Sequence, residues 1–379
     1  MAEQKNKKCK VVMMIANSPY TPYFRFFAEK AANEGNIEFT YIFLSLEKPK
    51  TIEATEPFGV KNYWYFFDYR IDKKIQYLKI TWKLFRLFKK IKPDIVHTHL
   101  FDDSLPGLLA AKWAGIKKRY ITKQDTTFHF LYAPKGMRYD KMNNRNATLL
   151  IPASQESFDF IVNEEEGNPK KMKIVHHGVD IKEFTSANAE ELNWIREKFN
   201  PQGKIMIGTV ARLVESKGYK FLIEAIEKVV AVRKDVIFVG AGHGPLTEEM
   251  QNLINQKGLQ DHFILAGFIE KKYIPAFYQS LNIYIHASIY EPFGFVIPEA
   301  VFNKVPLITT NTGASRDAFT HLESAFFIRE KNADDIADGI FYYLNNNPKS
   351  MVENAFQKAS EMYTLDKMWE GYRNLYLNE

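Results

Sequence analysis

Two glutamates, Glu291 and Glu299, are the residues of this chain with the clearest capacity for chemistry. They flank the stretch Pro-Phe-Gly-Phe-Val-Ile-Pro, which comes after an apolar run at 281–286. The run predicts a buried strand, and Glu299 lies about one turn into the helix predicted after it. Carboxylates accept hydrogen bonds from sugar hydroxyls, and a helix N-terminus offers free N–H groups to an anion. The spacing therefore favours a ligand that is part sugar and part phosphate.

Both glutamates also have an ordinary interpretation. Glu291 can simply solvate a loop, and Glu299 can be a first-turn acid that the helix dipole stabilises. Their spacing alone does not separate the two interpretations, so the decision rests on the rest of the chain.

Two cations lie in a similar place earlier in the chain. Arg212 and Lys217 occur in Val-Ala-Arg-Leu-Val-Glu-Ser-Lys-Gly at 210–218, between a predicted strand and a predicted helix. Together they can clamp a diphosphate, the guanidinium as a fork and the ammonium as a point charge. Without an anion, cations at a helix N-terminus are mildly unfavourable. The alternative is a pair of ordinary loop charges.

A glycine-rich loop at 240–245, Gly-Ala-Gly-His-Gly-Pro, follows another predicted strand and includes Gly242. Glycines let a backbone approach a ligand closely. The loop lacks the glycine spacing of a dinucleotide-binding fingerprint, so a plain strand-to-helix turn is an equal alternative.

His97 and His99 alternate along a predicted strand, so their side chains point to the same face. A metal site would need a further ligand, and we favour a polar pair that faces a cleft, with a structural role for at least one of the two. The chain has no Asp-x-Asp, no Gly-x-Ser-x-Gly and no P-loop. We therefore expect no metal and no cofactor, with basic residues neutralising a leaving diphosphate instead.

The size and composition of the chain predict two domains in a reducing compartment. Its 379 residues exceed the usual limit of a single core, and 46% of them are hydrophobic. The single cysteine, Cys9, excludes a disulfide framework. The charged first residues do not resemble a signal peptide, and no apolar stretch is long enough to span a membrane. We therefore expect a cytoplasmic protein.

The net charge of +6 is unevenly distributed. Residues 1–180 contain 30 Lys and Arg against 20 Asp and Glu, which gives +10, and the remainder contains 21 against 25, which gives −4. A basic first half indicates an anionic partner such as a membrane surface, a lipid-phosphate acceptor or nucleic acid. No nucleic-acid-binding module is recognised in the sequence, so nucleic acid is not expected.

The segment Lys73–Lys92 contains eight basic residues and no acidic one. Its apolar stripe consists of Ile75, Leu78, Trp82, Phe85 and Phe88. This composition is typical of a helix that lies on an anionic membrane surface. The alternative is a helix that packs its stripe on the first sheet and has a basic solvated face.

Strand patterns alternate with helical patterns along the whole chain, which predicts an α/β architecture. The expected strands are 10–16, 37–44, 94–99, 119–122, 148–152, 204–212, 236–240, 263–266, 282–286, 305–309 and 325–328. The expected helices are 23–33, 73–92, 104–114, 155–165, 218–232, 245–258, 274–280, 299–303 and 334–345, with 179–202 as the connection. The pattern predicts two Rossmann-like doubly wound domains facing a cleft, with ligands bound at the carboxyl ends of the strands.

Taken in order, these motifs resemble the retaining glycosyltransferases of the GT-B fold, in the glycosyl transferases group 1 family. The matching run extends from Ile205 to about Arg316 and includes Arg212, Lys217-Gly218, 239–242, 265–268, 291–294, Glu299-Ala300, 306–310 and Gly313. The first half matches more loosely, through 93–99, Ala153-Ser154 and 177–180, ending at Phe184.

The resemblance implies roles for individual residues. Arg212 and Lys217 would hold the donor diphosphate, Glu291 would contact the donor sugar, and these are the catalytic candidates. The implied donor-binding residues are Gly242, Gly267, Phe268, Phe293, Gly294, Phe295 and Glu299. Among them, Glu299 would take the ribose hydroxyls, and the loop at Gly267 and Phe268 would lie beside the base.

Two departures from the family pattern lie in the first half. The loop 16–23 lacks the paired glycines that the family usually has there, and Gln124 stands where the family tends to have a histidine. Glutamine can hydrogen-bond a sugar hydroxyl but cannot act as an acid or base. His129 lies five residues further on. The candidates for the acceptor or sugar side are Asn17, His99, Gln124 and His129.

The sequence therefore predicts a retaining, metal-independent glycosyltransferase. It would move a sugar from a nucleotide diphosphate sugar to a glycan or lipid-linked acceptor in cell-surface polysaccharide synthesis. Residues 1–180 would form the acceptor-side domain, 181–365 the nucleotide-sugar domain, and 366–379 a C-terminal helix that packs back on the first. Peripheral attachment at the inner face of the cell membrane remains open. The alternatives are a GT-B-like nucleotide-sugar epimerase or hydrolase and a non-catalytic sugar- or membrane-binding module.

Overall fold

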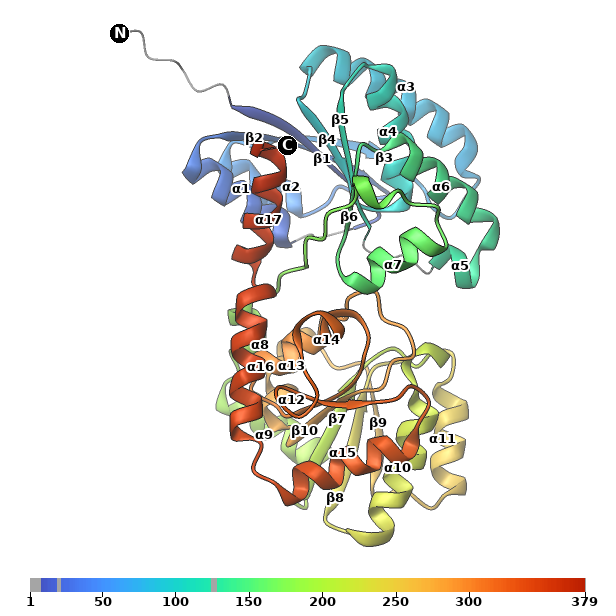
Figure 1. The fold of residues 1–379 in the computed structure, drawn as a ribbon, viewed down its shortest axis with the longest axis vertical. Helices are drawn as coiled ribbons and strands as arrows, with labels where there is room; N and C mark the ends of the chain where they lie inside the picture. Colours follow the sequence, from blue (N-terminus) through green and yellow to red (C-terminus); the bar gives the residue numbers. More distant parts are fainter. Residues whose placement is uncertain (1–7, 19–21, 124–127, 379) are drawn as a thin grey trace. The chain divides into compact units, whose positions relative to one another are not determined.

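The computed structural model describes residues 8–18, 22–123 and 128–378. The chain folds into two compact units (Figure 1). Unit 1 comprises the residues up to His176 together with those from Met368 on, and unit 2 comprises His177–Lys367. Within the described residues, no helix is long and apolar enough to cross a bilayer.

Unit 1 is built on a parallel sheet in the order β3-β2-β1-β4-β5-β6. Its strands are β1 (Cys9–Ala16), β2 (Ile37–Ser45), β3 (Lys61–Phe66), β4 (Ile95–Thr98), β5 (Lys118–Lys123) and β6 (Leu149–Pro152). Its α-helices are α1 (Pro22–Glu34), α2 (Thr51–Thr55), α3 (Lys73–Ile91), α4 (Phe101–Trp113), α5 (Phe128–Tyr132), α6 (Met137–Asn146) and α7 (Gln155–Asn163). Short 3₁₀ turns are η1 (Glu56–Phe58), η2 (Pro134–Gly136) and η3 (Pro169–Lys171).

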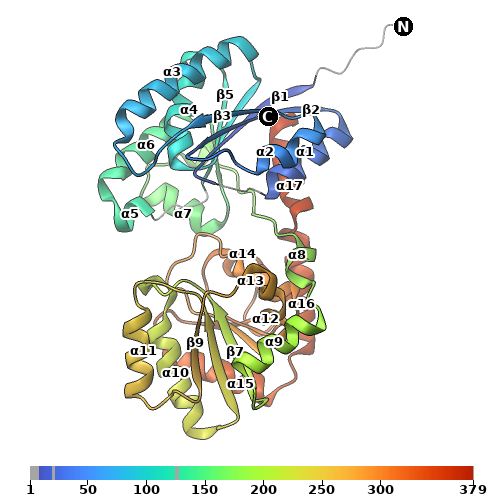
Figure 2. The same cartoon turned by 180° about the vertical axis from the view of Figure 1, so that it is seen from behind.

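The helices of unit 1 cover both faces of its sheet. The helices α1 and α2 lie on one face, and α3, α4 and α6 lie on the other (Figures 1 and 2). This is the doubly wound arrangement that right-handed crossovers produce when the strand order reverses at β1 and β4. The C-terminal helix α17 (Leu365–Asn378) lies on the α1 face, where Trp369 packs against Phe27 with ring centroids 5.2 Å apart.

Unit 2 repeats the architecture with a parallel sheet in the order β12-β11-β10-β7-β8-β9. Its strands are β7 (Ile205–Val210), β8 (Val236–Ala241), β9 (Phe263–Gly267), β10 (Ile283–His286), β11 (Leu307–Thr310) and β12 (Phe326–Ile328). Its helices are α8 (Ile181–Thr185), α9 (Ala189–Phe199), α10 (Tyr219–Val232), α11 (Thr247–Gln256), α12 (Ile274–Ser280), α13 (Val296–Phe302), α14 (Gly313–Ala318), α15 (Ala333–Asn345) and α16 (Lys349–Met362), with η4 (Glu215–Lys217) and η5 (Lys271–Tyr273).

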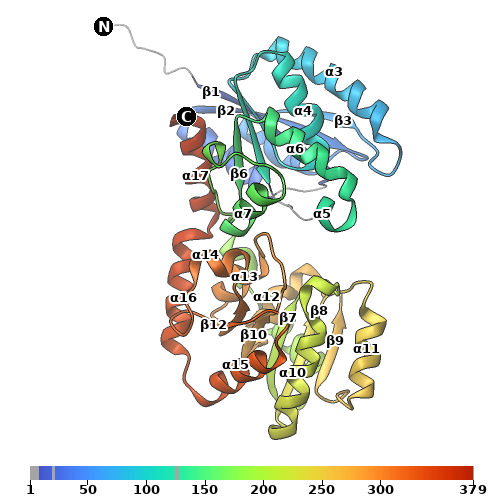
Figure 3. The same cartoon turned by 45° about the vertical axis from the view of Figure 1, so that its right-hand side comes forward.

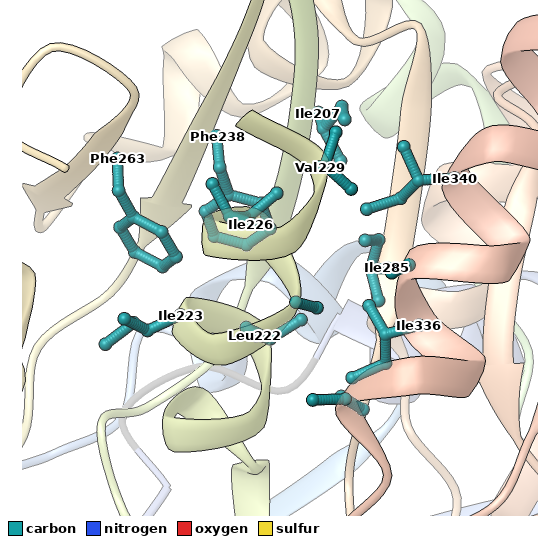
Figure 4. Packing of buried hydrophobic residues seen from close by; sticks show 14 of the residues in the cluster. Ile207, Leu222, Ile223, Ile226, Val229, Phe238, Phe263, Ile285, Ile336 and Ile340 are labelled. Carbon is teal, nitrogen blue, oxygen red and sulfur yellow. The ribbon is translucent and has the colours of Figure 1, made fainter. Parts of the chain in front are cut away.

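The core of unit 2 follows from the apolar periodicity of α10. This helix lies beside α15 (Figure 3). Its buried side chains recur at helical spacing, so one stripe faces the sheet. Ile223 and Ile226 of that stripe pack toward Phe238 of β8, while Ile336 of α15 lies near Ile285 of β10 (Figure 4). This buried cluster includes residues of β7, β8 and β10, so it holds in place the strands whose following loops carry the candidate site residues.

The predicted pair of Rossmann-like doubly wound domains is confirmed by these two sheets. Every strand expected from the sequence is present, but β3 was not expected. Its sequence, Lys-Asn-Tyr-Trp-Tyr-Phe, is rich in aromatic residues that suit strands, and it forms the edge of the sheet without a fully buried face. The segment 179–202, expected as a connection, contains α8 and α9, and α13 begins at Val296 rather than Glu299.

Candidate functional site

The structure brings Lys217 and Glu291 into direct contact. Lys217 ends η4, after β7, and Glu291 follows β10. The two loops are joined by a backbone hydrogen bond of 2.8 Å from the Ile289 N–H to the Ser216 carbonyl. Lys217 Nζ then lies 2.5 Å from Glu291 Oε2, with side chains 19% and 13% exposed. The predicted clamp cation and the predicted sugar-contacting carboxylate thus form one partly buried ion pair.

Glycines hold the backbone at this place. Gly218 has a φ of +70°, and a Cβ on it would lie 2.3 Å from the Ala287 carbonyl oxygen. Gly294 has a φ of +81°, and a Cβ there would lie 2.8 Å from Glu291 Cγ. Other residue types would therefore be strained by the backbone conformation and would also collide with a neighbour. This explains why the loops after β7 and β10 place a glycine at each of these two positions.

His286 is a member of this cluster that the sequence analysis did not identify as a site residue. It is the last residue of β10, and its Nε2 lies 3.8 Å from Glu291 Oε2. Burial, with a further contribution from the charge of Lys217, lowers the pKa of His286 to about 3. The imidazole is therefore neutral at physiological pH. The one signal in the sequence was a polar residue that ends an otherwise apolar strand.

The remaining loops at this edge of the unit 2 sheet are also tied together. The Gly242 N–H donates to the Gly267 carbonyl at 2.8 Å, which joins the loops after β8 and β9. Gly242 has a φ of +141°, and a Cβ on it would lie 2.0 Å from the Ala211 carbonyl oxygen. Arg212 follows Ala211 and is exposed. Among the described residues, its side chain forms no ion pair and no hydrogen bond.

Glu299 is placed differently from Glu291. It lies in the first turn of α13, is 8% exposed, and accepts a hydrogen bond of 2.8 Å from the Tyr278 hydroxyl. Burial raises the pKa of Glu299 from 4.5 to about 7, and the nearby negative charge of Glu183 adds to the increase. A carboxyl with such a pKa changes its charge near neutral pH, and a hydroxylated ligand that donates hydrogen bonds favours its ionised form.

The predicted aromatic contacts divide into exposed and packed side chains. Phe268 is 81% exposed, next to Gly267 with its φ of +69°. Phe293 is 2% exposed and Phe295 is 46% exposed, and their ring centroids lie 5.1 Å apart. His177 stacks on Phe295 at 5.0 Å and meets Phe293 edge-on at 5.2 Å. The packing of His177 against this loop was not predicted.

Unit 1 has its own pocket of about 320 Å³. Three of the four residues predicted for the acceptor or sugar side line it, namely Asn17, His99 and His129. The fourth, Gln124, lies outside the described residues. The other lining residues are Tyr69, Lys73, Leu100, Phe101, Asp102, Ile121, Thr122, Lys123, Asp140 and Asn143.

One wall of this pocket is organised around Asp102. Its carboxylate accepts hydrogen bonds from Asn17 Nδ2 at 2.7 Å and from Lys73 Nζ at 2.9 Å, and the Tyr77 hydroxyl also donates to it. Asn17 adopts a φ of +55°, a conformation that asparagine tolerates better than most residues. The carboxylate is thereby matched by a cation and held in place.

A second group of lining residues, around Asp140, belongs to a buried charge network. His129 Nδ1 lies 2.5 Å from Asp140 Oδ2, and Lys123 Nζ lies 3.6 Å from Asp140 Oδ1 and 2.7 Å from Glu165 Oε2. Lys123 and Glu165 are 5% and 1% exposed in their side chains. Burial alone would lower the pKa of Lys123, but the two carboxylates outweigh it and raise the pKa. The network keeps the ammonium charged beneath the pocket.

His97 and His99 stack on each other with ring centroids 4.3 Å apart. His97 bonds the Tyr376 hydroxyl at 2.7 Å and the Thr122 hydroxyl at 2.8 Å, so it is a satisfied structural residue. The expected structural role for at least one of the two histidines is confirmed by His97, whose buried partners come from α17 and β5. The expectation that the pair faces a cleft is wrong for His97. His99 lines the pocket, and its Nε2 has no hydrogen-bond partner within the part of the chain that is described.

Comparison with family models covers most of the chain. Residues 190–358 match the model described as glycosyl transferases group 1. Residues 29–183 match the model described as glycosyltransferase family 4. The two matches correspond to the main parts of unit 2 and unit 1.

Individual relatives are more distant. An uncharacterised glycosyltransferase of Methanocaldococcus jannaschii is 28% identical over 210 residues, which cover 54% of each chain. The UDP-Gal:α-D-GlcNAc-diphosphoundecaprenol α-1,3-galactosyltransferase of Escherichia coli is 23% identical over 80% of this chain and 81% of its own. This chain spans about half the length of most of the first curated relatives that it matches.

The fold has close counterparts among solved structures. The crystal structure of HepE from Anabaena in complex with UDP and glucose aligns with a TM-score of 0.78. The alignment covers 98% of this chain and 100% of that one at 17% identity.

Proposed function

The chain is a group 1 glycosyltransferase of GT-B type, and from this premise we propose that it is a retaining, metal-independent enzyme. It transfers a sugar from a nucleotide diphosphate sugar to a glycan or lipid-linked acceptor in cell-surface polysaccharide synthesis. The observation that carries the proposal is the cluster of Lys217, Glu291 and His286 at the carboxyl end of the unit 2 sheet. Ligands of doubly wound sheets bind at this end of the strands.

The donor is bound by unit 2 in this proposal. Arg212, exposed and without a partner among the described side chains, and Lys217 hold the diphosphate. Glu291 accepts hydrogen bonds from the sugar hydroxyls, and Glu299 accepts them from the ribose. Exposed Phe268 covers the base beside Gly242 and Gly267, and Phe293, Gly294 and Phe295 shape the backbone around the sugar. Solved HepE structures that contain UDP and UDP-glucose support a nucleotide donor for this fold.

The transfer proceeds on one face of the sugar. The acceptor hydroxyl oxygen forms a bond to the anomeric carbon as the bond from that carbon to the diphosphate oxygen breaks. The electron pair of the broken bond stays on the diphosphate, which also takes the proton of the attacking hydroxyl. Arg212 and Lys217 stabilise the charge that develops on the diphosphate, and such preorganised electrostatic stabilisation is usually the largest catalytic contribution.

The acceptor is bound by unit 1, in the pocket that Asn17, His99 and His129 line. The carboxylates that line this pocket already form ion pairs with lysines, so the pocket has little unpaired charge with which to bind a charged ligand. Within the part of the chain that the structure describes, His99 Nε2 and both amide atoms of Asn143 are buried and have no hydrogen-bond partner. Such atoms favour a ligand with neutral hydroxyl groups, because burying them unpaired is costly. A glycosyl residue of the acceptor meets this requirement.

The two other classes of function predict different behaviour. An epimerase or hydrolase of nucleotide sugars would turn over its donor without any acceptor. A non-catalytic sugar- or membrane-binding module would bind a donor or a bilayer and never turn over. The polysaccharide and glycolipid relatives favour transfer to an acceptor.

A thermal-shift panel of nucleotide sugars tests the proposal directly. A donor present at 100 times its dissociation constant adds about 2.7 kcal/mol to the free energy of unfolding, and thereby raises the melting temperature. We expect one nucleotide sugar to stabilise the protein more than its free nucleoside monophosphate does. Absence of stabilisation by the whole panel would contradict the proposed function, and consumption of the donor without acceptor would redirect it to hydrolysis or epimerisation.

Helix α3 supports a membrane-surface role in the same proposal. Its core side is formed by Ile80, Leu84, Leu87 and Phe88. Of the stripe predicted from the sequence, Phe88 belongs to this core, but Ile75, Leu78 and Trp82 are 62%, 70% and 57% exposed. With Tyr69 and Ile71, two exposed residues that directly precede α3, they make up what we call the apolar patch, comprising Tyr69, Ile71, Ile75, Leu78 and Trp82.

The charge around the apolar patch suits an anionic bilayer. The exposed basic residues of α3 are Lys74, Lys79, Lys83, Arg86, Lys89 and Lys90. Apolar side chains enter the headgroup boundary while each cation near an anionic surface contributes about 1 kcal/mol. Tyr69 of the apolar patch and Lys73 of α3 also line the unit 1 pocket, so a lipid-linked acceptor would reach it from that surface. The proposed location is the inner face of the cell membrane.

Replacing Lys79, Lys83, Arg86 and Lys89 by glutamine should abolish most binding to anionic vesicles at physiological salt, because the electrostatic attraction is lost. Vesicle co-sedimentation measures this, with neutral vesicles for comparison. The matched control replaces four exposed lysines of unit 1 elsewhere, namely Lys48, Lys50, Lys117 and Lys170. Equal loss in the control, or equal absence of binding by the unmodified protein to both vesicle types, would leave α3 an ordinary solvated helix.

A further inference from the structure

The buried nitrogen of His286 has no partner in a place where one is expected. Its Nε2 is buried and forms no hydrogen bond within the described residues. Buried polar atoms are nearly always paired, and those that are not call for a functional reason. The nearest charged group is the Glu291 carboxylate, whose Oε2 lies 3.8 Å away. This distance exceeds the usual donor–acceptor distance of an N–H···O hydrogen bond by about half an ångström or more.

Glu291 is held instead by Lys217, at 2.5 Å from the same oxygen. The side chain of Glu291 is 13% exposed, so its carboxylate depends on a partner nearby. A neutral imidazole still has one N–H group that it can donate. His286 is therefore a second donor adjacent to Glu291, not engaged while Lys217 is in place.

We propose that His286 is a positioning residue that takes over Glu291 when the donor diphosphate draws Lys217 away. This rests on the proposed function, in which Lys217 is a diphosphate ligand. A diphosphate carries more negative charge than one carboxylate, so it competes for the ammonium when it binds. The hydrogen bond from His286 then keeps the Glu291 carboxylate ionised and directed at the sugar.

The surroundings of Glu291 limit how far its carboxylate can move. Its Cγ lies 2.8 Å from the position that a Cβ on Gly294 would occupy, so Gly294 and Glu291 are in close contact. The Gly313 Cβ position is likewise 2.9 Å from the Glu291 carbonyl oxygen. Because Glu291 Oε2 already lies 3.8 Å from His286 Nε2, we expect a side-chain rotation of Glu291 to bring the two atoms within hydrogen-bond distance. The exchange therefore needs only side-chain adjustments.

Substitution of His286 by leucine, compared with glutamine, tests the proposal by steady-state kinetics. His286→Leu should lower kcat/KM for the nucleotide sugar by about tenfold or more. It should also weaken binding of the free nucleoside diphosphate, because the hydrogen bond that forms when the diphosphate binds is then missing. His286→Gln retains a side-chain N–H donor and should recover most of the loss. His262→Gln is the control, since His262 is a partly buried histidine of the same unit that contacts the Val236 carbonyl.

A spectroscopic measurement separates positioning from simple packing. The ¹⁵N signal of His286 Nε2 should shift when the nucleoside diphosphate binds, and the same shift should be present without ligand in Lys217→Met. An unshifted signal in both cases, or full activity of His286→Leu, would overturn the proposal. If Lys217→Ala lowers turnover and His286→Leu does not, only this inference fails. If Lys217→Ala retains normal turnover, the proposed function of the cluster fails as well.

Discussion

Replacing Lys217 by alanine is expected to lower turnover by about a hundredfold or more, because a preorganised cation is then missing where charge develops on the leaving diphosphate. Arg212→Ala should cause a loss of similar size. The two differ in their effect on the unliganded protein. Arg212 is exposed and has no partner among the described side chains, so its removal leaves the fold unchanged. Removal of the Lys217 side chain, in contrast, leaves Glu291 without its ion-pair partner.

The test of Lys217 must therefore separate charge from stability. Lys217→Gln removes the charge but keeps an N–H donor toward Glu291, and it should be as inactive as Lys217→Ala with less loss of thermal stability. Lys220→Ala is the matched control, because Lys220 is an exposed lysine a few residues further along. Turnover is measured at saturating donor, and melting temperature confirms the fold. Near-normal turnover of Lys217→Gln would contradict the clamp.

The fold was predictable because both domains follow the periodicity rules closely. Strands such as β8 are buried on both faces and appear as continuous apolar runs, and α10 has an apolar stripe at helical spacing. The exception with functional consequences is α6. Its buried residues are Asp140, Asn143, Asn144 and Asn146, so no apolar periodicity marks it. Polar burial is stabilised by specific partners in three dimensions, and no local pattern in the sequence encodes them.

The sequence located the loops that carry Lys217 and Glu291, after β7 and β10, but it did not predict that the two side chains pair. Sequence reasoning assigned Lys217 to the diphosphate and Glu291 to the sugar as separate contacts. In the structure the two side chains form an ion pair, because a backbone hydrogen bond from the Ile289 N–H to the Ser216 carbonyl brings two loops together that are distant in sequence. The sequence analysis did not identify His286 for the same reason. Its place in the cluster follows only from the proximity in space of the end of β10 and the loop that carries Glu291. The pairs Lys123–Glu165 and His129–Asp140 likewise connect residues of different elements.

The two glutamates should separate nucleotide binding from sugar transfer. Glu299→Ala is expected to weaken binding of the nucleoside diphosphate by about 10- to 150-fold, the effect of losing hydrogen bonds to a charged acceptor worth about 1.5–3 kcal/mol. Glu291→Ala should leave that binding unchanged or tighter, because Glu291 competes with the diphosphate for Lys217. It should instead lower turnover with the intact donor. Calorimetry with nucleoside diphosphate alone measures the first effect.

The pH dependence provides a second measure of Glu299. Its pKa in the folded protein is about 7, above the ordinary 4.5, so the carboxyl is protonated below neutral pH. The folded state binds the proton more tightly than the unfolded state does, so this group's contribution to stability is present below pH 4.5 and lost as pH rises through about 7. Ribose hydroxyls donate to the ionised form, and nucleotide affinity should therefore rise with pH across the same range.

Glu299→Gln isolates this contribution. The amide has nearly the same shape and retains an oxygen that can accept from the Tyr278 hydroxyl, but it does not titrate. The nucleotide's own ionisation is the same for both proteins, so the difference between their affinity profiles reports Glu299 alone. The unmodified protein should gain affinity relative to Glu299→Gln as pH rises through about 7. Parallel affinity profiles of the two proteins would contradict the ribose contact of Glu299. A larger loss of nucleoside diphosphate binding in Glu291→Ala than in Glu299→Ala would reverse the assignment of the two carboxylates.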